Sequence, residues 1–240
     1  MKQTLTKNYR DQLVNTSDSY KQMAVKVYDA LVENFPQTYL VGGTVRNLIL
    51  ARPIADIDIA TEAKPEKVLL LLKKLGCKID LKGIRFGVIS VLIKNKAVEI
   101  ATFRKEAYSG SRFPKIIFTK SINLDAKRRD FTINCLYFHP KTNKLYDPYN
   151  GAKDIKNRVI KLIGNAEQRL EEDPLRIVRA YRFENELDLH FDSATLTAIR
   201  NKLHLVNDIT VSKLKSEIAK SKTAATRKYL TKIFKKLLHK

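Results

Sequence analysis

Residues 40–60 read LVGGTVRNLILARPIADIDIA, so a glycine pair, a short helical pattern and an acidic strand follow one another. In residues 56–59 aspartate and isoleucine alternate strictly, which predicts a strand with both aspartates on one face and both isoleucines on the other. The apolar residues 38–41 predict another strand immediately before the glycines. This segment therefore predicts, in order, a strand, a glycine turn, a helix over residues 44–50 and an acidic strand.

The glycine pair suits the phosphates of a nucleotide, and the two aspartates suit the Mg²⁺ ion that accompanies it. Gly42 and Gly43 precede the predicted helix, so backbone N–H groups and the positive helix end can approach the phosphates. Asp56 and Asp58, on one strand face and within reach of each other, supply the oxygen ligands that a hard cation such as Mg²⁺ prefers. Together these residues predict a cradle for a nucleotide and Mg²⁺.

A third carboxylate would complete a two-metal site, in which one metal activates the attacking hydroxyl and the other steadies the triphosphate. We assign Glu99 to this role, because it lies in an apolar strand where burying an unpaired acid is costly. A surface position on an edge strand is the alternative for Glu99. The predicted catalytic and metal-binding residues are thus Asp56, Asp58 and Glu99.

The rest of the pattern divides the chain into a mixed part and a helical part. Helical stripes over residues 20–35 and 65–75 and β-rich runs over residues 86–93 and 97–103 predict an α/β half. After residue 166 the strand signals end. Helices are predicted there over residues 166–171, 174–187, 193–204, 210–221 and 223–239.

Basic residues dominate the composition: 46 lysines and arginines against 25 acids leave a net charge of +21. This excess indicates a polyanionic partner such as RNA, although a lysine-rich solvated surface is the alternative. No apolar run is long enough to span a membrane and no N-terminal signal core is present, so a cytoplasmic protein without membrane contact is expected. Cys77 and Cys135 lie far apart, outside any C-x-x-C pattern, which indicates neither zinc nor a disulfide.

Several motifs occur together along the chain. They read LVGGTVRN at residues 40–47, DIDIAT at 56–61, RRDFTIN at 128–134, DPYNG at 147–151, EDPLR at 172–176 and RAYRF at 179–183. In this order they resemble the head and neck of bacterial-type (class II) tRNA nucleotidyltransferases, the CCA-adding enzymes, of the family that also contains bacterial poly(A) polymerases. The resemblance covers residues 38 to 220.

The resemblance implies an α+β fold, with a mixed-sheet nucleotidyltransferase head followed by an all-helical neck and without the family's usual body and tail domains. We expect an N-terminal helical extension at residues 1–36, the catalytic head at 37–163 and the neck, with basic C-terminal helices, at 164–240. The last predicted helix either caps the neck with a solvated lysine face or grips RNA; both interpretations stay open.

The implied activity is template-independent addition of CCA to the 3′ end of tRNA from CTP and ATP, with release of pyrophosphate. Mg²⁺ is the implied cofactor, the tRNA acceptor end the partner, and no obligate protein partner is expected. Three alternatives stay open: a poly(A) polymerase, a tRNA nucleotidyltransferase that adds only CC or only A, and a catalytically idle RNA-binding module. A small-molecule nucleotidyltransferase shares the glycine and aspartate pattern but leaves the motif at 172–176 unexplained.

Base selection is expected from Asp173 and Arg176, which are three residues apart on a predicted helix and hence neighbours on one face. An acceptor beside a fork of donors matches cytosine and adenine, which both present an exocyclic amine next to a ring-nitrogen acceptor, and mismatches uracil and guanine. An ordinary ion pair between the two side chains is the alternative. By resemblance, Arg179 and Arg182 also lie at the nucleotide site.

The resemblance adds further nucleotide-binding residues, namely Gly42, Gly43 and Arg46 in the first motif and Arg129 beside Asp130, with Asp130 close to the ribose. Residues 102–114 resemble the mobile loop that lets CCA-adding members change from C to A addition. The sequence departs from the family pattern at a few positions that hold no proposed ligand. These are Asn47, Phe113, Cys135 and residues 210–213.

Overall fold

The alternating isoleucines and aspartates do form a strand, β2 (Ile57–Thr61), in the middle of a seven-stranded sheet. The computed structural model describes residues 1–108 and 114–238; Phe113 and the tip of the expected mobile loop lie outside the described residues. The described residues form two units, one comprising 1–108, 114–129 and 134–152 and the other 130–133 and 153–238. The domain bounds expected at 36 and 163 stay a prediction.

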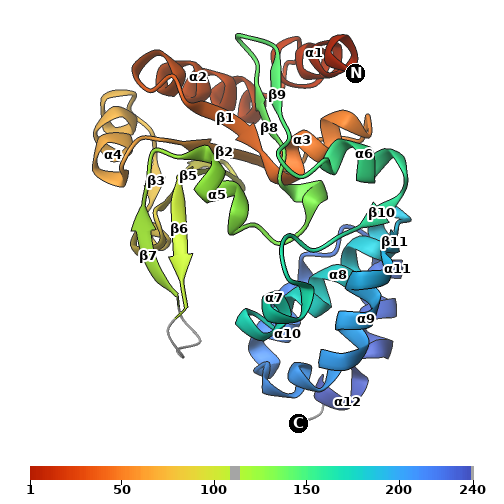
Figure 1. The fold of residues 1–240 in the computed structure, drawn as a ribbon. Helices are drawn as coiled ribbons and strands as arrows, with labels where there is room; N and C mark the ends of the chain where they lie inside the picture. Colours follow the sequence, from red (N-terminus) through yellow and green to blue (C-terminus); the bar gives the residue numbers. More distant parts are fainter. Residues whose placement is uncertain (109–113, 239–240) are drawn as a thin grey trace. The chain divides into compact units, whose positions relative to one another are not determined.

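The sheet of the first unit has the strand order β3-β4-β5-β2-β1-β8-β9 (Figure 1). Its β2 and β5 run parallel, whereas its other neighbouring pairs are antiparallel. The strands are β1 (Thr38–Val41), β2, β3 (Ile79–Asp80), β4 (Val88–Ile93), β5 (Lys96–Thr102), β8 (Tyr137–His139) and β9 (Lys144–Tyr146). The strand expected over residues 86–93 therefore begins at Val88, because Phe86 ends a 3₁₀ turn over Ile84–Phe86.

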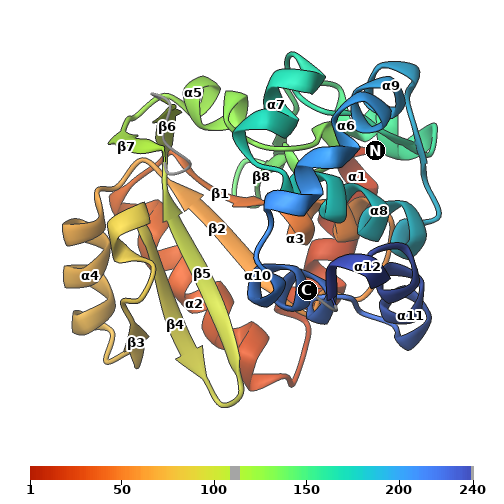
Figure 2. The ribbon, with the colours of Figure 1, turned by 90° about the horizontal axis from the view of Figure 1, so that it is seen from below.

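In the first unit, the helix α2 (Ser19–Asn34) covers the apolar side of this sheet (Figure 2). Figure 2 shows α2 running behind the strands. The helices are α1 (Lys2–Tyr9), continued by a π-helical turn (Arg10–Val14), α2 (Ser19–Asn34), α3 (Gly42–Ile49), α4 (Pro65–Lys74) and α5 (Ile122–Lys127). The buried Ile57, Ile59, Val98 and Ile100 alternate with Asp58 and Glu99, so the carboxylates lie on the opposite face from the apolar side chains.

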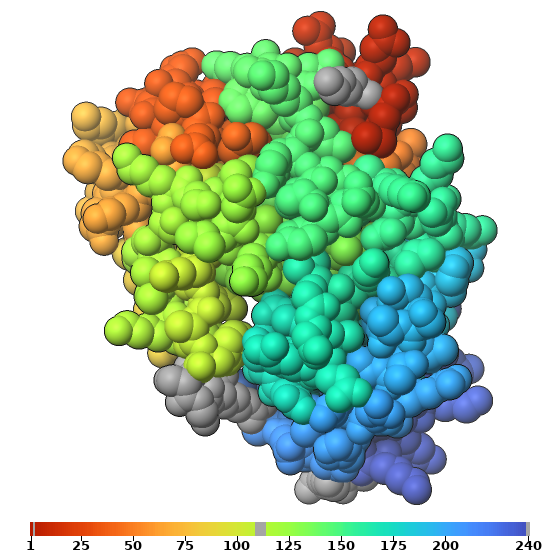
Figure 3. All heavy atoms as spheres, in the orientation of Figure 1, coloured from red at the N-terminus to blue at the C-terminus, as the bar shows by residue number. Residues whose placement is uncertain are grey.

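The N-terminal residues lie beside the β8–β9 hairpin at the surface (Figure 3), where Thr6 donates a hydrogen bond to Asn143 in the hairpin turn. Leu5 and Leu13 are buried, so α1 and the following turn contribute to the apolar core of the first unit. A second, two-stranded sheet joins β6 (Arg104–Ala107) to β7 (Lys115–Phe118) as an antiparallel ladder. Residues 104–107 of the expected mobile loop thus form a strand.

The second unit is mainly helical. Its helices are α7 (Ala166–Glu172), α8 (Leu175–Leu187), α9 (Ser193–Lys202), α10 (Val211–Ala219), α11 (Ala224–Ile233) and α12 (Lys235–Leu238), with a 3₁₀ segment at Leu203–Asp208. The short α6 (Gly151–Lys156) begins in the first unit and ends in the second. The α+β fold class, a mixed-sheet head followed by a helical neck, is confirmed.

Two details of the helical part differ from the prediction. The strand β11 (His190–Phe191) pairs in parallel with β10 (Val159–Ile160), although no strand was expected after residue 166. Two residues are too few to show an alternating pattern, which is why the sequence did not reveal this strand. The helix expected over 223–239 is divided at Phe234 into two helices; Leu230, Phe234 and Leu237 are buried, while Ile233 is 40% exposed.

Candidate active site

The predicted catalytic carboxylates meet on two neighbouring parallel strands. In the register of β2 and β5, Asp58 lies directly opposite Glu99, and Asp56 immediately precedes β2. Because β5 lies between β4 and β2, Glu99 is not on an edge strand, although its side chain is at the surface as that alternative expected. The reason given for Glu99 is wrong, because its side chain is exposed and not buried in the apolar strand.

The pKa of Asp58 reflects its place in this row of carboxylates. The pKa of Asp58 is raised to about 7, chiefly by burial and also by the negative charges of Glu99 and Asp56, while Arg129 and Arg46 act in the opposite direction. Like charges held this close favour protonation unless a cation compensates them. The row therefore has the oxygen chemistry of a site for a divalent cation.

The carboxylate row is open. In the part of the chain that the structure describes, no three His, Cys, Asp or Glu side chains are grouped closely enough to hold a metal ion by themselves. Asp56 and Glu99 are exposed while Asp58 is half-buried. The residues present fit a hard cation that takes its remaining ligands from substrate oxygens or water, as Mg²⁺ commonly does.

The glycine pair lies against this row. Gly42 has φ +60°, and a Cβ placed on it would lie 3.6 Å from Oδ2 of Asp58 and 3.7 Å from Nη1 of Arg129. A Cβ on Gly43 would lie 3.5 Å from Nη2 of Arg46 and 3.9 Å from the same oxygen of Asp58. The absence of side chains at both positions keeps the space beside the Asp58 carboxylate open.

The sequence predicted a glycine turn before the helix, and this prediction is wrong. The helix α3 begins at Gly42 itself, and the N–H of Gly42 donates to the carbonyl of Leu136 at 3.3 Å. Sequence reasoning also missed Thr44 in the first turn. Its hydroxyl accepts a hydrogen bond from the N–H of Asp58 at 2.9 Å and donates to the carbonyl of Asp56 at 3.2 Å, so it fixes the backbone of the acidic strand.

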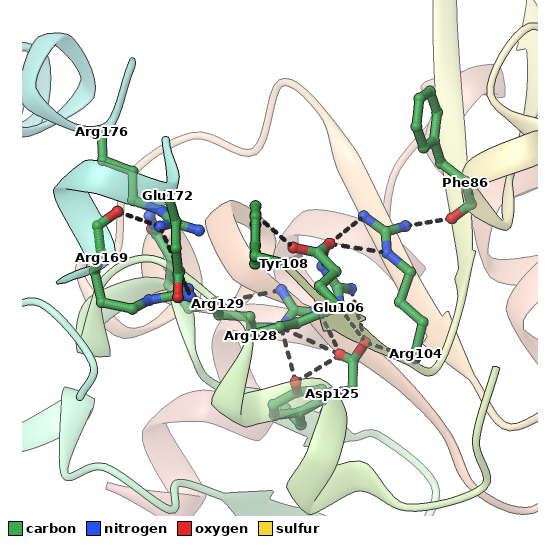
Figure 4. Close-up of polar contacts among 12 residues, drawn as sticks. Phe86, Arg104, Glu106, Tyr108, Asp125, Arg128, Arg129, Arg169, Glu172 and Arg176 are labelled. Carbon is green, nitrogen blue, oxygen red and sulfur yellow. Dashed lines mark hydrogen bonds and ion pairs between the residues drawn. The ribbon is translucent and has the colours of Figure 1, made fainter. Parts of the chain in front are cut away.

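Arg46 and Arg129, both expected at the nucleotide, lie close to the carboxylate row. Arg46 donates from its guanidinium to the side chain of Asn134, the last residue of the RRDFTIN motif. Arg129 is held by Asp125 at 3.1 Å (Figure 4) and by the hydroxyl of Tyr137 at 2.7 Å. Asp125 and Tyr137 were not singled out from the sequence, because nothing local distinguishes them from ordinary helix and strand residues.

Asp130 and Arg179 face each other in the second unit. Nη2 of Arg179 lies 2.7 Å from Oδ2 of Asp130, and its Nε lies 3.9 Å from Oε1 of Glu217. Burial lowers the pKa of the Arg179 guanidinium, but the charges of Asp130 and Glu217 outweigh burial and raise it above its ordinary value. Asp130 and Arg179, each expected at the nucleotide site, are therefore joined to each other by an ion pair.

Arg182 lies in the same network but deeper. It is 8% exposed, and its guanidinium donates to Oε1 of Glu217 at 2.9 and 3.1 Å and to Glu186 at 3.3 Å. Burial alone would raise the pKa of Glu217, but Arg179, Arg182 and Lys220 outweigh it and hold that pKa below its ordinary value. The partners of Arg182 are thus carboxylates of its own unit.

Asp173 and Arg176 do not share a helix face, so this part of the prediction is wrong. The helix α7 ends at Glu172, Asp173 is extended, and α8 begins at Leu175. The cause is Pro174, because the residue before a proline is disfavoured in the helical conformation. Oδ1 of Asp173 instead accepts from the N–H of Leu175 at 3.2 Å.

The alternative, an ion pair between Asp173 and Arg176, is not formed within the described residues either. Arg176 is 4% exposed and pairs with Glu172, with Nη1 3.2 Å from Oε2, while also donating to the carbonyl of Arg169 (Figure 4). Glu172 and Arg169 therefore fix the guanidinium plane of Arg176. Asp173 and Arg176 are joined only through the backbone, where the N–H of Arg176 donates to the carbonyl of Asp173 at 3.0 Å.

Comparison with known proteins decides the family. Residues 38–161, just over half of the chain, match the family described as the Poly A polymerase head domain. The chain belongs to this family. The match contains the glycine pair, the carboxylate row and the RRDFTIN motif, so the nucleotidyltransferase head expected from the motifs is confirmed.

Curated relatives in this family are bacterial CCA-adding enzymes, as expected. The chain is 41% identical to that of Lactobacillus delbrueckii subsp. bulgaricus over 199 residues, which cover 82% of this chain and 49% of the relative. It is 38% identical to that of Ligilactobacillus salivarius over 208 residues, 86% of this chain and 50% of the relative. The chain thus spans about half the length of the curated relatives it matches.

Solved structures give the same result. The CCA-adding enzyme of Bacillus stearothermophilus in complex with CTP has a TM-score of 0.74 at 36% identity, covering 88% of this chain and 51% of that one. A tRNA nucleotidyltransferase complexed with a primer tRNA and an incoming ATP analog has a TM-score of 0.65 at 26% identity, covering 83% and 57%. Among the described residues, no helix is both long and apolar enough to cross a membrane.

Proposed function

We propose that this chain carries the catalytic head and neck of an enzyme that adds C, C and A to the 3′ end of tRNA from CTP and ATP. The observation that carries the proposal is the row of Asp56, Asp58 and Glu99 beside Gly42 and Gly43, within the family match. The net charge of +21 supports a polyanionic substrate. The named ligands of the similar structures, CTP, an ATP analog and primer tRNA, support the substrate classes.

In the proposed reaction the 3′-hydroxyl oxygen of the RNA attacks the α-phosphorus of the nucleotide. The new P–O bond extends the RNA by one nucleotide, the bond to the β-phosphate breaks, and pyrophosphate leaves while the hydroxyl proton passes to solvent. Asp56, Asp58 and Glu99 would hold Mg²⁺, which would lower the pKa of the attacking hydroxyl and offset charge on the phosphates. Thr44 keeps the backbone of this row in place through its bonds to residues 56 and 58.

Arginines close to the row supply the positive charge that a triphosphate needs. Arg46 and Arg129 both act on Asp58 electrostatically, which supports their assignment to the nucleotide phosphates. Gly42 and Gly43 leave room for these phosphates, because any side chain there would meet Asp58, Arg129 or Arg46. Asp130, held by Arg179, is proposed to contact the ribose.

Base choice is proposed for Asp173 and Arg176. Arg176 presents a guanidinium whose plane is fixed by Glu172 and by the carbonyl of Arg169, and a fixed fork of donors recognises an acceptor edge at low entropic cost. Asp173 supplies the acceptor for the exocyclic amine of cytosine or adenine. A site built on such polar groups can reject a mismatched base by a factor of up to about 10⁴ to 10⁵.

The proposal is tested with tRNA transcripts that lack the last three, two or one nucleotides, each incubated with one labelled nucleotide at a time. CCA addition predicts CMP incorporation on the two shorter transcripts and AMP incorporation only on the transcript ending in CC. Runs of AMP on every transcript would instead identify a poly(A) polymerase. Incorporation of CMP alone or AMP alone would identify a partial enzyme, and no incorporation at all, with tRNA still bound, an idle RNA-binding module.

A matched control separates the carboxylate row from the charge of the protein. Asp58→Asn removes one carboxylate of the row. Asp80→Asn removes one from β3 of the same sheet, where, among the described residues, Asp80 pairs with the exposed Lys82 alone. Loss of incorporation in the first variant with normal incorporation in the second is expected. Equal activity of the two variants would refute the site.

A further inference from the structure

The carboxylate of Asp125, on α5, is the centre of a polar network in the first unit (Figure 4). Asp125 is fully buried. One of its oxygens, Oδ1, accepts from Arg128 at 2.7 and 2.9 Å and from the backbone N–H of Arg104 at 3.2 Å. The other, Oδ2, accepts from Tyr137 at 2.7 Å and from Arg129 at 3.1 and 3.3 Å.

The two oxygens have different tasks. The partners of Oδ1 are linked to β6, since Arg104 is the first residue of β6 and both Arg104 and Arg128 pair with Glu106 of that strand, at 3.2 and 3.5 Å. These contacts fix the carboxylate. The partners of Oδ2 are the guanidinium of Arg129 and the hydroxyl of Tyr137, which itself accepts from Arg129.

Arg129 is held from three sides. Asp125 binds its Nε and Nη2, the hydroxyl of Tyr137 accepts from its Nε at 2.7 Å, and its guanidinium lies 4.7 Å from the centre of the Tyr137 ring. Its other terminal nitrogen, Nη1, donates to the carbonyl of Asn134 at 3.5 Å and lies beside Gly42, where an added Cβ would be 3.7 Å from it. An arginine side chain otherwise has many rotamers, and fixing one costs up to about 2 kcal/mol of conformational entropy.

From this geometry we propose that Asp125 is a positioning residue that sets the guanidinium of Arg129 beside Gly42 and the Asp58 carboxylate. The proposal rests on the proposed function in one respect, the assignment of Arg129 to the nucleotide. Burial alone would raise the pKa of Asp125, but Arg128, Arg129 and the Tyr137 hydroxyl outweigh it and lower this pKa to about 2. The Asp125 carboxylate is therefore charged at any working pH.

The test combines a direct readout of Arg129 with kinetics. In ¹⁵N NMR spectra of the wild-type protein, the Nε–H of Arg129 is expected to give a signal protected from solvent exchange, and Asp125→Asn is expected to abolish that protection. The same variant should raise KM for CTP about tenfold with a smaller change in kcat, the effect of losing one charged hydrogen bond. A protected signal in Asp125→Asn would overturn the proposal whether or not the protein incorporates nucleotides.

A double-mutant cycle separates positioning from general stability. If Asp125 acts through Arg129, then Asp125→Asn in an Arg129→Ala background causes no further loss of kcat/KM for CTP. Losses that multiply would overturn the proposal. Suppose instead that Arg129→Ala leaves KM for CTP unchanged, while the Arg129 signal loses its protection in Asp125→Asn. The positioning of Arg129 by Asp125 then stands, and the assignment of Arg129 to the nucleotide fails.

Two further variants keep the test decisive. Glu106→Gln removes a charge from the Oδ1 side without touching Arg129, so KM for CTP should stay within about twofold of wild type and the Arg129 signal should remain; the same losses as in Asp125→Asn would overturn the proposal. If Asp125→Asn fails to fold, Tyr137→Phe removes the hydroxyl partner of both Asp125 and Arg129 while keeping the ring. Because Asp125 still binds Nε and Nη2 of Arg129 in that variant, protection of the Arg129 signal should remain, and its loss would show that Tyr137 sets the guanidinium and would overturn the proposal.

Discussion

Replacing Arg182 by alanine tests whether this arginine serves the nucleotide or the helical unit. In the structure its guanidinium is buried and bonded twice to Glu217, at 2.9 and 3.1 Å, and once to Glu186 at 3.3 Å. Removing one partner of a buried ion pair costs about 3–5 kcal/mol, chiefly because the other charge stays buried. Glu217 keeps Lys220 at 2.9 Å and Arg179 at 3.9 Å, so the lower end, about 3 kcal/mol, is expected.

The assay is equilibrium unfolding in urea together with thermal unfolding. In a chain of this size 1 kcal/mol shifts Tm by about 2–4 °C, so Arg182→Ala should lower Tm by about 6–12 °C. Arg200→Ala, at an exposed position of α9, is the control and should change stability by less than about 0.5 kcal/mol. A loss below about 1 kcal/mol for Arg182→Ala, combined with a raised KM for nucleotide, would refute the structural role and favour the nucleotide-binding role.

Three further predictions concern the site and its support. The pKa of Asp125 is about 2 in the folded protein against an ordinary 3.8, so ionised Asp125 stabilises the fold by about 2 kcal/mol. This stabilisation is complete above about pH 4 and is lost as the pH falls through about 2. Acid unfolding of Asp125→Asn should lack this pH-dependent component, and identical acid unfolding profiles of wild type and variant would contradict the prediction. Asp173→Ala should let UTP and GTP compete better with CTP and ATP, by about 1–3 kcal/mol of discrimination, whereas unchanged selectivity in a four-nucleotide competition would exclude base reading. Gly42→Ala and Gly76→Ala both place a side chain at positive φ, so each should lower the free energy of unfolding in urea by about 1–2 kcal/mol. Only Gly42→Ala should raise KM for CTP, because a Cβ on Gly76 meets nothing within 4 Å. Equal KM values in the two variants would show that the space beside Asp58 is not used.

The sequence predicted well what depends on local periodicity. Alternation over residues 56–59 placed Asp58 and the isoleucines on opposite faces of β2, and the structure has them there. The third carboxylate, Glu99, was identified correctly as a neighbour of Asp58 but for a wrong reason. Its strand register with β2 depends on pairing between segments about forty residues apart, which no local pattern specifies.

The errors arose where a local signal was overlooked or where the partner is distant. Pro174 indicated that Asp173 would not be helical, and this signal was available in the sequence. The partner of Arg182, Glu217, lies 35 residues further along the chain, so an arginine that a motif assigned to the nucleotide is buried in an ion pair that only the fold shows. The position of Asp125 between two arginines and Tyr137 likewise needs the sheet that brings β8 to α5.

The most direct test of the central claim is single-turnover incorporation of labelled CMP by wild type and Asp58→Asn at saturating CTP, tRNA and Mg²⁺. If the carboxylate row carries the chemistry, Asp58→Asn loses several kcal/mol of transition-state stabilisation, so its rate should fall at least about 10³-fold while tRNA binding and Tm stay near wild type. A rate above about a tenth of wild type, with the variant folded and tRNA bound, would contradict the account.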